Sequence, residues 1–197
     1  MNEQLSFFET PQPSGPDYNL ILAIFPDDYT AQQISELGNS IRKMHGLQEK
    51  LRPVTHLHVS LPVPSHVMHP TETVIERISR ACKAVATTMS PFEIKFDQVL
   101  SFRGRVGNRA VVLLNNNHGS DGILSLYRLL CAEFAKLGPA ASSTPKFAPH
   151  LTLLYDQQEL PPKPVPQVCW WVKEIVLVLS EVGATKYHRL GCWPLGE

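Results

Sequence analysis

Two short motifs in this chain each place a hydroxyl residue two positions after a histidine. They are His58-Val59-Ser60 and His150-Leu151-Thr152. Each motif lies in a run of alternating polar and aliphatic residues, and period-two alternation is typical of a half-buried β-strand. In such a strand the histidine and the hydroxyl residue point to one face and the aliphatic residues to the other. Two imidazoles and two hydroxyls can therefore face one groove.

This set of side chains is suited to acid–base chemistry on a phosphate ester. Histidine titrates near neutral pH, so a pair can supply one general acid and one general base. The hydroxyls of Ser60 and Thr152 can donate hydrogen bonds to phosphate oxygens. One motif alone carries little weight, because a water-exposed histidine on an edge strand has the same pattern. The repetition in one apolar frame favours His58 and His150 as catalytic residues, with no cofactor or metal expected.

The composition is that of a globular protein without a dominant charge. Hydrophobic residues make up 43% of the 197 residues, which is enough for a real core. The 18 basic residues balance the 18 acidic ones. A broad basic surface for long duplex nucleic acid is therefore not expected, whereas a short or terminal nucleic-acid ligand in a local groove remains open.

The distribution of cysteines and apolar residues indicates the cellular compartment in which we expect the protein. The four cysteines are scattered without a C-x-x-C pair, which gives no indication of a zinc ribbon or a redox motif. No segment approaches the roughly 18 apolar residues of a membrane span, and the first residues lack the features of a signal peptide. We expect a cytoplasmic protein that does not enter a membrane. Because both motifs lie in one chain, we expect a monomer.

Hydrophobic periodicity predicts strands separated by three amphipathic helices. A flexible N-terminal arm is expected over residues 1–17, and the segment Thr30-x-x-Gln33 resembles a capping box that opens the first helix. Residues 156–167, with four prolines, are expected to form an extended loop. The expected strands are 19–25, 54–62, 92–102, 109–115, 148–155, 172–181 and 185–193.

This order of elements predicts an α+β fold. The motif strands lie in the two halves of the chain, which suggests two similar lobes about a pseudo-twofold groove. We expect residues 18–197 to form one bilobal domain. Two antiparallel sheets would line the central groove, with the helices outside.

The chain resembles the two-histidine phosphoesterases, and among them the bacterial 2′-5′ RNA ligase / RNA 2′,3′-cyclic phosphodiesterase group. The resemblance rests on the two motifs, the strand of residues 20–26 and the closing segments 175–180 and 187–190. It covers nearly all of residues 19–195. It implies a bilobal fold and metal-free opening of 2′,3′-cyclic phosphates on RNA ends or cyclic nucleotides. The products would be 2′-phosphates, and 2′-5′ RNA ligation would be the reverse reaction. By motif position, His58 would be the general acid and His150 the general base.

The sequence departs from the family pattern at one position. Relatives often carry arginine five residues after the second motif histidine, where this chain has Tyr155. A cation for the phosphate must then come from elsewhere. Arg103 and Arg105, in the hairpin between two expected strands, are the first candidates, and Tyr155 is a further candidate for phosphate binding.

Two other functions remain open. A metal-dependent phosphodiesterase could use His56 and His58, which would share one strand face if the first motif strand began at residue 54. Against this, no Asp or Glu stands near either motif. A non-catalytic module that binds RNA ends would instead use aromatic side chains for base stacking, and turnover would distinguish it from an enzyme. The aromatic candidates are Phe8, Phe102, Tyr155 and Trp193.

Overall fold

The computed structural model describes residues 18–64, 70–102, 107–115, 121–137, 147–181, 183 and 186–196. The expected N-terminal arm, residues 1–17, lies outside these residues, as do Arg103 and Arg105. The strands are β1 (Tyr18–Ile24), β2 (Val59–Leu61), β3 (Phe92–Ser101), β4 (Arg109–Leu114), β5 (His150–Asp156), β6 (Lys163–Val172), β7 (Glu174–Glu181) and β8 (Lys186–Pro194). The helices are α1 (Asp28–His45), α2 (Glu72–Ala86) and α3 (Asp121–Ala135), with a short 3₁₀ helix, η1 (Val54–His56).

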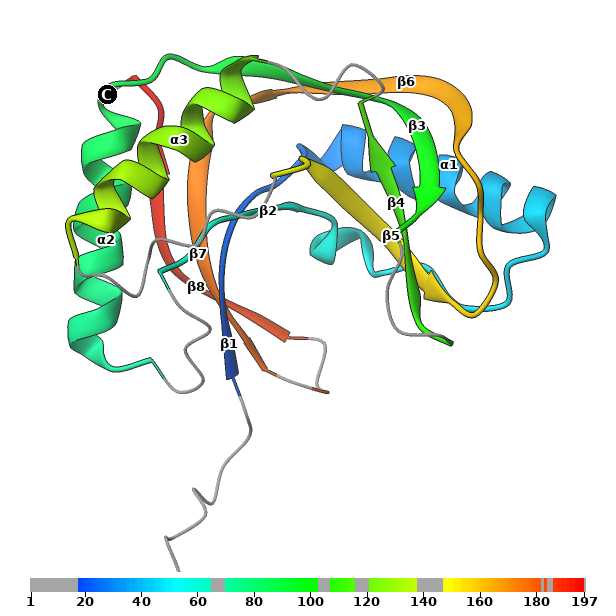
Figure 1. Cartoon of the computed structure of the whole chain (residues 1–197), viewed down its shortest axis with the longest axis horizontal. Coiled ribbons are helices and arrows are strands. Elements are labelled where there is room, and N and C mark those ends of the chain that lie inside the picture. Colours follow the sequence, from blue (N-terminus) through cyan, green and yellow to red (C-terminus); the bar gives the residue numbers. More distant parts are fainter. Residues whose placement is uncertain are drawn as a thin grey trace, which may run out of the picture.

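The described strands form one antiparallel sheet in the order β6-β3-β4-β5-β2-β1-β7-β8 (Figure 1). The α+β class is confirmed, but the expectation of two separate sheets is not, because hydrogen bonds join the two halves. The junction is narrow. β2 has three residues, and its register with β5 contains the single pair Val59 and Leu151. The two motif strands are thus the two strands at the junction.

The helices pack at both ends of the sheet. Figure 1 shows α2 and α3 together on one side and α1 on the other, with β1 and β2 between them. Their apolar faces cover the buried side of the strands. Ile34 of α1, Ile24 of β1 and Phe134 of α3 are at most 2% exposed. Among the described helices, none is both long and apolar enough to cross a membrane.

The first helix begins earlier than its capping box predicted. α1 begins at Asp28, and its N-cap is Asp27, whose carboxylate accepts hydrogen bonds from the Thr30 backbone N–H at 2.9 Å and the Thr30 hydroxyl at 3.0 Å. Thr30 is therefore the third helical residue. Both Asp and Thr can cap a helix, and here the carboxylate occupies the capping position.

The expectation of a loop over residues 156–167 is wrong for its second half, which is a strand from Lys163 on. β6 begins at Lys163 and pairs with β3, although it contains Pro164 and Pro166. A proline removes one backbone donor, which an edge strand tolerates on its unpaired side. The two prolines are two residues apart, so their missing N–H groups lie on the same side of the strand. Because the prolines favoured an extended loop, the sequence pattern did not indicate this edge strand.

Candidate active site

The register of β2 with β5 brings the two motifs together. Because Val59 pairs with Leu151 in an antiparallel ladder, His58 lies across from Thr152 and Ser60 lies across from His150. Val59 and Leu151 themselves are fully buried. The four motif side chains therefore lie on the opposite, groove face. The two histidines are diagonal neighbours, a relationship that typically separates side-chain origins by about 7–8 Å.

Both histidines are anchored in the same way. The Nδ1 atom of His58 lies 2.8 Å from the backbone oxygen of His56, and that of His150 lies 2.8 Å from the backbone oxygen of Ala148. A carbonyl oxygen only accepts, so in each ring Nδ1 carries the hydrogen and Nε2 keeps its lone pair. Nε2 of His58 lies 3.1 Å from the Ser60 hydroxyl, which donates to it. Each imidazole thus has its basic nitrogen free of backbone contacts.

Aromatic rings bury the two imidazoles and lower their basicity. The His58 ring lies 5.7 Å from the Phe25 ring and 5.9 Å from the Tyr187 ring, and His150 lies 4.7 Å from Phe102. Burial is the main cause that lowers the pKa of His58 to about 4, although its hydrogen bond to the His56 carbonyl acts in the opposite direction. The charges of Arg52, His56 and His150 lower it further. Burial also lowers the pKa of His150. Both imidazoles are therefore neutral at pH 7 in the free protein.

His56 does not share a strand face with His58. It ends η1, three residues before β2, and its ring is 6% exposed. The ring stacks on Tyr187, with centroids 3.9 Å apart and planes 4° apart. The expectation of a strand from residue 54 is wrong here, because the chain makes a helical turn first. Within the described residues, no group of three or more His, Cys, Asp or Glu is arranged to hold a metal ion.

Tyr155 reaches the groove face because of a bulge in the pairing of β4 with β5. The register shifts between Val111 and Val112, and both Leu153 and Leu154 are buried. Strict alternation from His150 would place Tyr155 on the core side. The bulge shifts the alternation by one residue, so Tyr155 is 43% exposed on the side of His150 and Thr152.

Two functional candidates were missed by the sequence analysis. Arg52 donates from Nη2 to the Tyr187 hydroxyl at 3.1 Å, and its charge lowers the pKa of His58. A single arginine before Pro53 gives no periodic signal. Tyr187 stands in a closing strand whose pattern marks it as structural. Only the tertiary contact between residues 52 and 187 reveals them.

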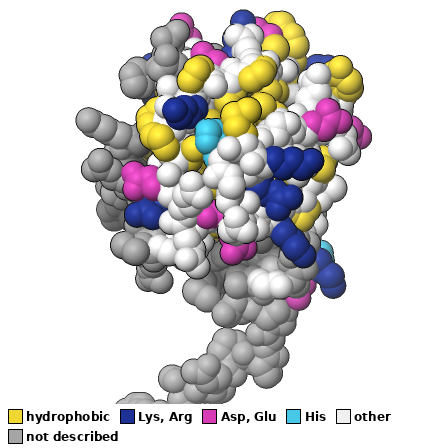
Figure 2. Space-filling model, turned by 90° about the vertical axis from the view of Figure 1, so that its right-hand side faces the viewer, with side chains coloured by type: hydrophobic (Ala, Val, Ile, Leu, Met, Phe, Trp, Pro, Cys, Tyr) yellow, Lys and Arg dark blue, Asp and Glu magenta, His cyan; other side chains and the backbone are white. Residues whose placement is uncertain are grey.

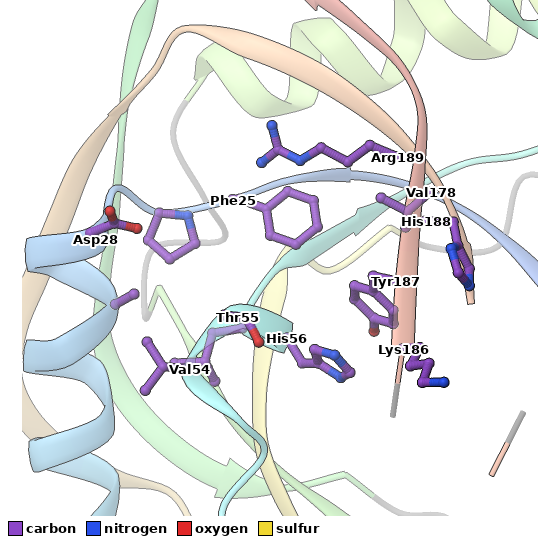
Figure 3. A pocket seen from close by; sticks show the side chains of 13 residues that line it. Phe25, Asp28, Val54, Thr55, His56, Val178, Lys186, Tyr187, His188 and Arg189 are labelled. Atoms are coloured by element: carbon purple, nitrogen blue, oxygen red, sulfur yellow. The ribbon is translucent and has the colours of Figure 1, made fainter. Parts of the chain in front are cut away.

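A cavity of about 560 Å³ adjoins the groove on the side of His58. In Figure 3, Phe25 just after β1, His56 of η1 and Tyr187 of β8 border the same space, with Arg189 above the ring of Phe25. The guanidinium carbon of Arg189 lies 5.9 Å from the centroid of that ring. Lys186 also lines the cavity. A flat ring, a cation and a polar rim fit a nucleotide-sized ligand.

The surface charge matches the balanced composition. The face drawn in Figure 2 shows a group of Lys and Arg side chains with acidic and hydrophobic side chains scattered around it. Such a face presents local rather than continuous positive charge. It suits a ligand held in one groove better than a long duplex.

The fold is shared with solved structures. TT0787 of Thermus thermophilus has a TM-score of 0.72 at 22% identity, covering 90% of this chain and 98% of that one. LigT of E. coli in its apo form has a TM-score of 0.66 at 23% identity, covering 93% and 100%. Usb1 of Kluyveromyces marxianus has a TM-score of 0.52 at 14% identity, covering 91% and 98%. A comparison with curated proteins gave no match.

The family follows from the sequence match rather than from these likenesses. Residues 26–184, well over half of the chain, match the 2′-5′ RNA ligase superfamily. That family supports a function of the phosphodiesterase or RNA-ligase type. With two histidine motifs on adjacent strands of this fold, the chain belongs to the 2′-5′ RNA ligase superfamily of two-histidine phosphoesterases.

Proposed function

We propose that this protein is a metal-independent RNA 2′,3′-cyclic phosphodiesterase, which opens cyclic phosphate ends to 2′-phosphates and can join ends by the reverse 2′-5′ ligation. The observation that carries the proposal is the matched pair of imidazoles. Each donates Nδ1–H to a carbonyl two residues earlier, and each presents Nε2 on the groove face, where that of His58 accepts from the Ser60 hydroxyl. A pair of this kind can act on opposite sides of one phosphorus atom.

The reaction would proceed by in-line displacement. Nε2 of His150 takes a proton from water as the water oxygen bonds to phosphorus. The bond from phosphorus to O3′ breaks, and Nε2–H of His58 gives its proton to O3′. The product is a 2′-phosphate with a free 3′-hydroxyl, and the two histidines have exchanged their protonation states. Solvent restores them before the next turnover.

His58 takes up its proton from solvent when the substrate binds. His58 is neutral in the free protein, because its pKa is lowered to about 4 mainly by burial. A bound phosphodiester carries a negative charge beside the ring, which favours the imidazolium and raises that pKa. Substrate binding would thus convert His58 into the general acid. The free imidazole of His150 is already in the form that a general base needs.

The phosphate would be held by hydroxyl groups. Ser60 and Thr152 flank the histidines on the groove face, and Tyr155 reaches the same face through the bulge. Arg103 and Arg105 remain candidates for the same role outside the described residues. E. coli LigT has been solved in complex with phosphate and with 3′-AMP, which supports a nucleotide phosphate as the ligand class here.

The neighbouring cavity would take the nucleoside. Its volume of about 560 Å³ lies within the usual range for small-molecule sites. Phe25 belongs both to the cavity and to the surroundings of His58, so a base stacked on this ring would leave its ribose near the histidines. RNA ends and cyclic mononucleotides would therefore share one site.

The test is turnover by metal-stripped protein. The full chain, treated with chelator, is incubated with 2′,3′-cyclic AMP and with RNA that ends in a cyclic phosphate, and the product isomer is identified by phosphorus NMR. We expect 2′-phosphates at an unchanged rate after metal removal. Binding without turnover would overturn the proposal in favour of an RNA-end-binding module. Activity that returns only with added zinc or manganese would overturn the metal-free mechanism.

A further inference from the structure

The backbone around Arg52 is fixed by contacts on both sides. Leu51 packs against α1 at Gly38, where a Cβ would lie only 3.0 Å from the leucine side chain. The backbone N–H of Arg52 donates to the carbonyl of Leu153 at 2.8 Å, beside the bulge that turns Tyr155 to the groove. Pro53 follows directly and caps η1. Arg52 is therefore anchored against the second motif strand although it precedes the first.

The side chain of Arg52 is held next to His58. Its Nη2 donates to the Tyr187 hydroxyl at 3.1 Å, and the Tyr187 ring stacks on His56 while its edge approaches His58. Within the described part of the chain, Arg52 forms no ion pair with a carboxylate, and its Nε is buried without an acceptor. A guanidinium that is neither paired nor fully solvated exerts a strong field on its neighbours.

The groove needs such a charge. The motif residues offer only neutral imidazoles and hydroxyls, and Tyr155 adds another hydroxyl. A phosphodiester that moves from water into this partly buried groove carries a negative charge, which is costly to bury without a partner. More charge develops on the phosphoryl oxygens during displacement, and preorganised positive charge stabilises it.

We propose that the guanidinium of Arg52, oriented by the Tyr187 hydroxyl, supplies the positive charge that binds and stabilises the phosphate between His58 and His150. This inference rests on the proposed function, because it assigns a further residue to the same site. Tyr187 is a positioning residue in this arrangement. Arg52 would replace the cation that the family pattern leads one to expect at the position of Tyr155.

A second described arginine, Arg189 in the wall of the cavity, is already engaged. Arg189 lies 3.9 Å from a carboxylate oxygen of Glu174 and sits over the ring of Phe25. Its place is in the wall of the cavity, toward the nucleoside end of the site. Tyr155 raises the pKa of Tyr187, which accepts the hydrogen bond of Arg52. Residues 52, 155 and 187 therefore lie in one region. A cation at position 155 would therefore act on the region that Arg52 serves.

The experiment exchanges the cation between two positions. Variants Arg52→Gln, Arg52→Lys and Tyr187→Phe are assayed on 2′,3′-cyclic AMP, together with the double variant Arg52→Gln/Tyr155→Arg. Arg128→Gln, on the exposed surface of α3, removes the same charge away from the groove and serves as the matched control. Removing one charge-assisted hydrogen bond typically costs roughly 10- to 100-fold. We expect that loss in kcat/KM for Arg52→Gln, a loss of at most about tenfold for Arg52→Lys and Tyr187→Phe, and none for Arg128→Gln.

Recovery in the double variant is the decisive result, because a purely structural arginine at position 52 cannot be replaced by one on β5. Equal losses in Arg52→Gln and Arg52→Lys without recovery would overturn the inference, as would unchanged kcat/KM in a folded Arg52→Gln protein.

A second measurement does not depend on turnover. Inorganic phosphate is titrated into wild type and Arg52→Gln while the imidazole signals of His58 and His150 are followed by NMR. We expect weaker phosphate binding in Arg52→Gln. We also expect a higher pKa of His58 in the phosphate-free variant, because a positive neighbour has been removed. If wild type binds phosphate through Arg52 but does not open cyclic phosphates, the proposed function fails and this inference stands. If phosphate binding and the His58 titration are the same in both proteins, the inference fails.

Discussion

Each candidate catalytic histidine takes its orientation from the backbone of its own strand. The carbonyl two residues earlier fixes which nitrogen carries the hydrogen, and an aromatic neighbour restricts the ring. The anchoring carbonyl belongs to His56 in the first motif and to Ala148 in the second. The side chain at the anchoring position is therefore free to differ. In the first motif the side chain at this position is the ring of His56, which stacks on Tyr187 and lines the cavity.

Removing either imidazole should abolish most of the activity. We expect His58→Ala and His150→Ala each to lower kcat on 2′,3′-cyclic AMP by roughly 10²-fold or more, because each removes one proton transfer. Ser60→Ala and Thr152→Ala should lose less, since each removes one hydrogen-bond donor of several. His45→Ala, at the end of α1, is the control and should match wild type. Retention of wild-type kcat by a folded His150→Ala protein would remove His150 from the mechanism.

The pH at which kcat/KM is highest should lie on the acid side of neutrality. The pKa of free His58 is lowered to about 4 and that of His150 is lowered as well, in both cases chiefly by burial. The profile of kcat/KM reports the free enzyme, so its maximum should lie below about pH 6.5, the ordinary histidine value. Both groups are deprotonated above that range, so kcat/KM should fall as pH rises.

The profile of kcat reports the complex and should be displaced to higher pH, because the bound phosphate favours the imidazolium. Calorimetry of 2′-AMP binding in buffers of different ionisation enthalpy should show proton uptake near pH 7. Binding without proton uptake would contradict this account of His58.

Strand β5 connects the groove with the rest of the fold. It contributes His150 and Thr152 to one face, bulges to expose Tyr155, and ends in the buried Asp156. The Asp156 carboxylate accepts the backbone N–H groups of Gln48 at 2.8 Å and Glu49 at 3.1 Å, after α1, and of Gln158 at 2.8 Å. The same strand thus fixes the segment that leads to Arg52. Burial alone would raise the pKa of Asp156, but these hydrogen bonds outweigh it and lower the pKa.

Neutralising Asp156 should destabilise the protein in a pH-dependent way. Asp156→Asn should lower the free energy of unfolding by about 1–3 kcal/mol at pH 7, because buried N–H donors lose a charged acceptor. A lowered native pKa means that the contribution is complete above the unfolded value of about 3.9 and is lost as pH falls through the native value. Urea unfolding of both proteins should therefore show a difference that shrinks below about pH 4. Asp121→Asn, in the first turn of α3, is the control. If the difference between wild type and Asp156→Asn does not depend on pH, the prediction is contradicted.

At the scale of the whole molecule, one narrow junction joins two halves of a single sheet. Each half contributes one motif strand, so the groove exists only where the halves meet at Val59 and Leu151. The helices flank the sheet, with α2 and α3 together on one side and α1 on the other (Figure 1). With equal numbers of acidic and basic residues, long-range attraction of nucleic acid is weak. On the proposed function, recognition would rest on the phosphate at the histidines and the nucleoside beside them.

This arrangement predicts a weak salt dependence. A protein that contacts one or two phosphates of a single strand should lose less than about tenfold in affinity between 50 mM and 200 mM salt, whereas one that contacts many loses far more. We therefore expect KM for cyclic-phosphate-ended RNA to change by less than about tenfold over that range. We also expect it to depend little on RNA length beyond the terminal nucleotides. A rise in affinity with each added nucleotide would show an extended RNA surface instead.

The sequence alone identified the two motifs and the class of fold. Period-two alternation around His58 and His150 and helical periodicity elsewhere depend on neighbours in the chain, so they can be recognised without a structure. The tertiary structure decided what depends on distant contacts. β6 is a strand because it lies at an edge where Pro164 and Pro166 are tolerated. Tyr155 faces the groove because β5 bulges against β4. Arg52 lies at the site because residues 51–53 pack against α1 and β5, and because Tyr187, 135 residues later, accepts its hydrogen bond. No local pattern encodes a contact across that separation.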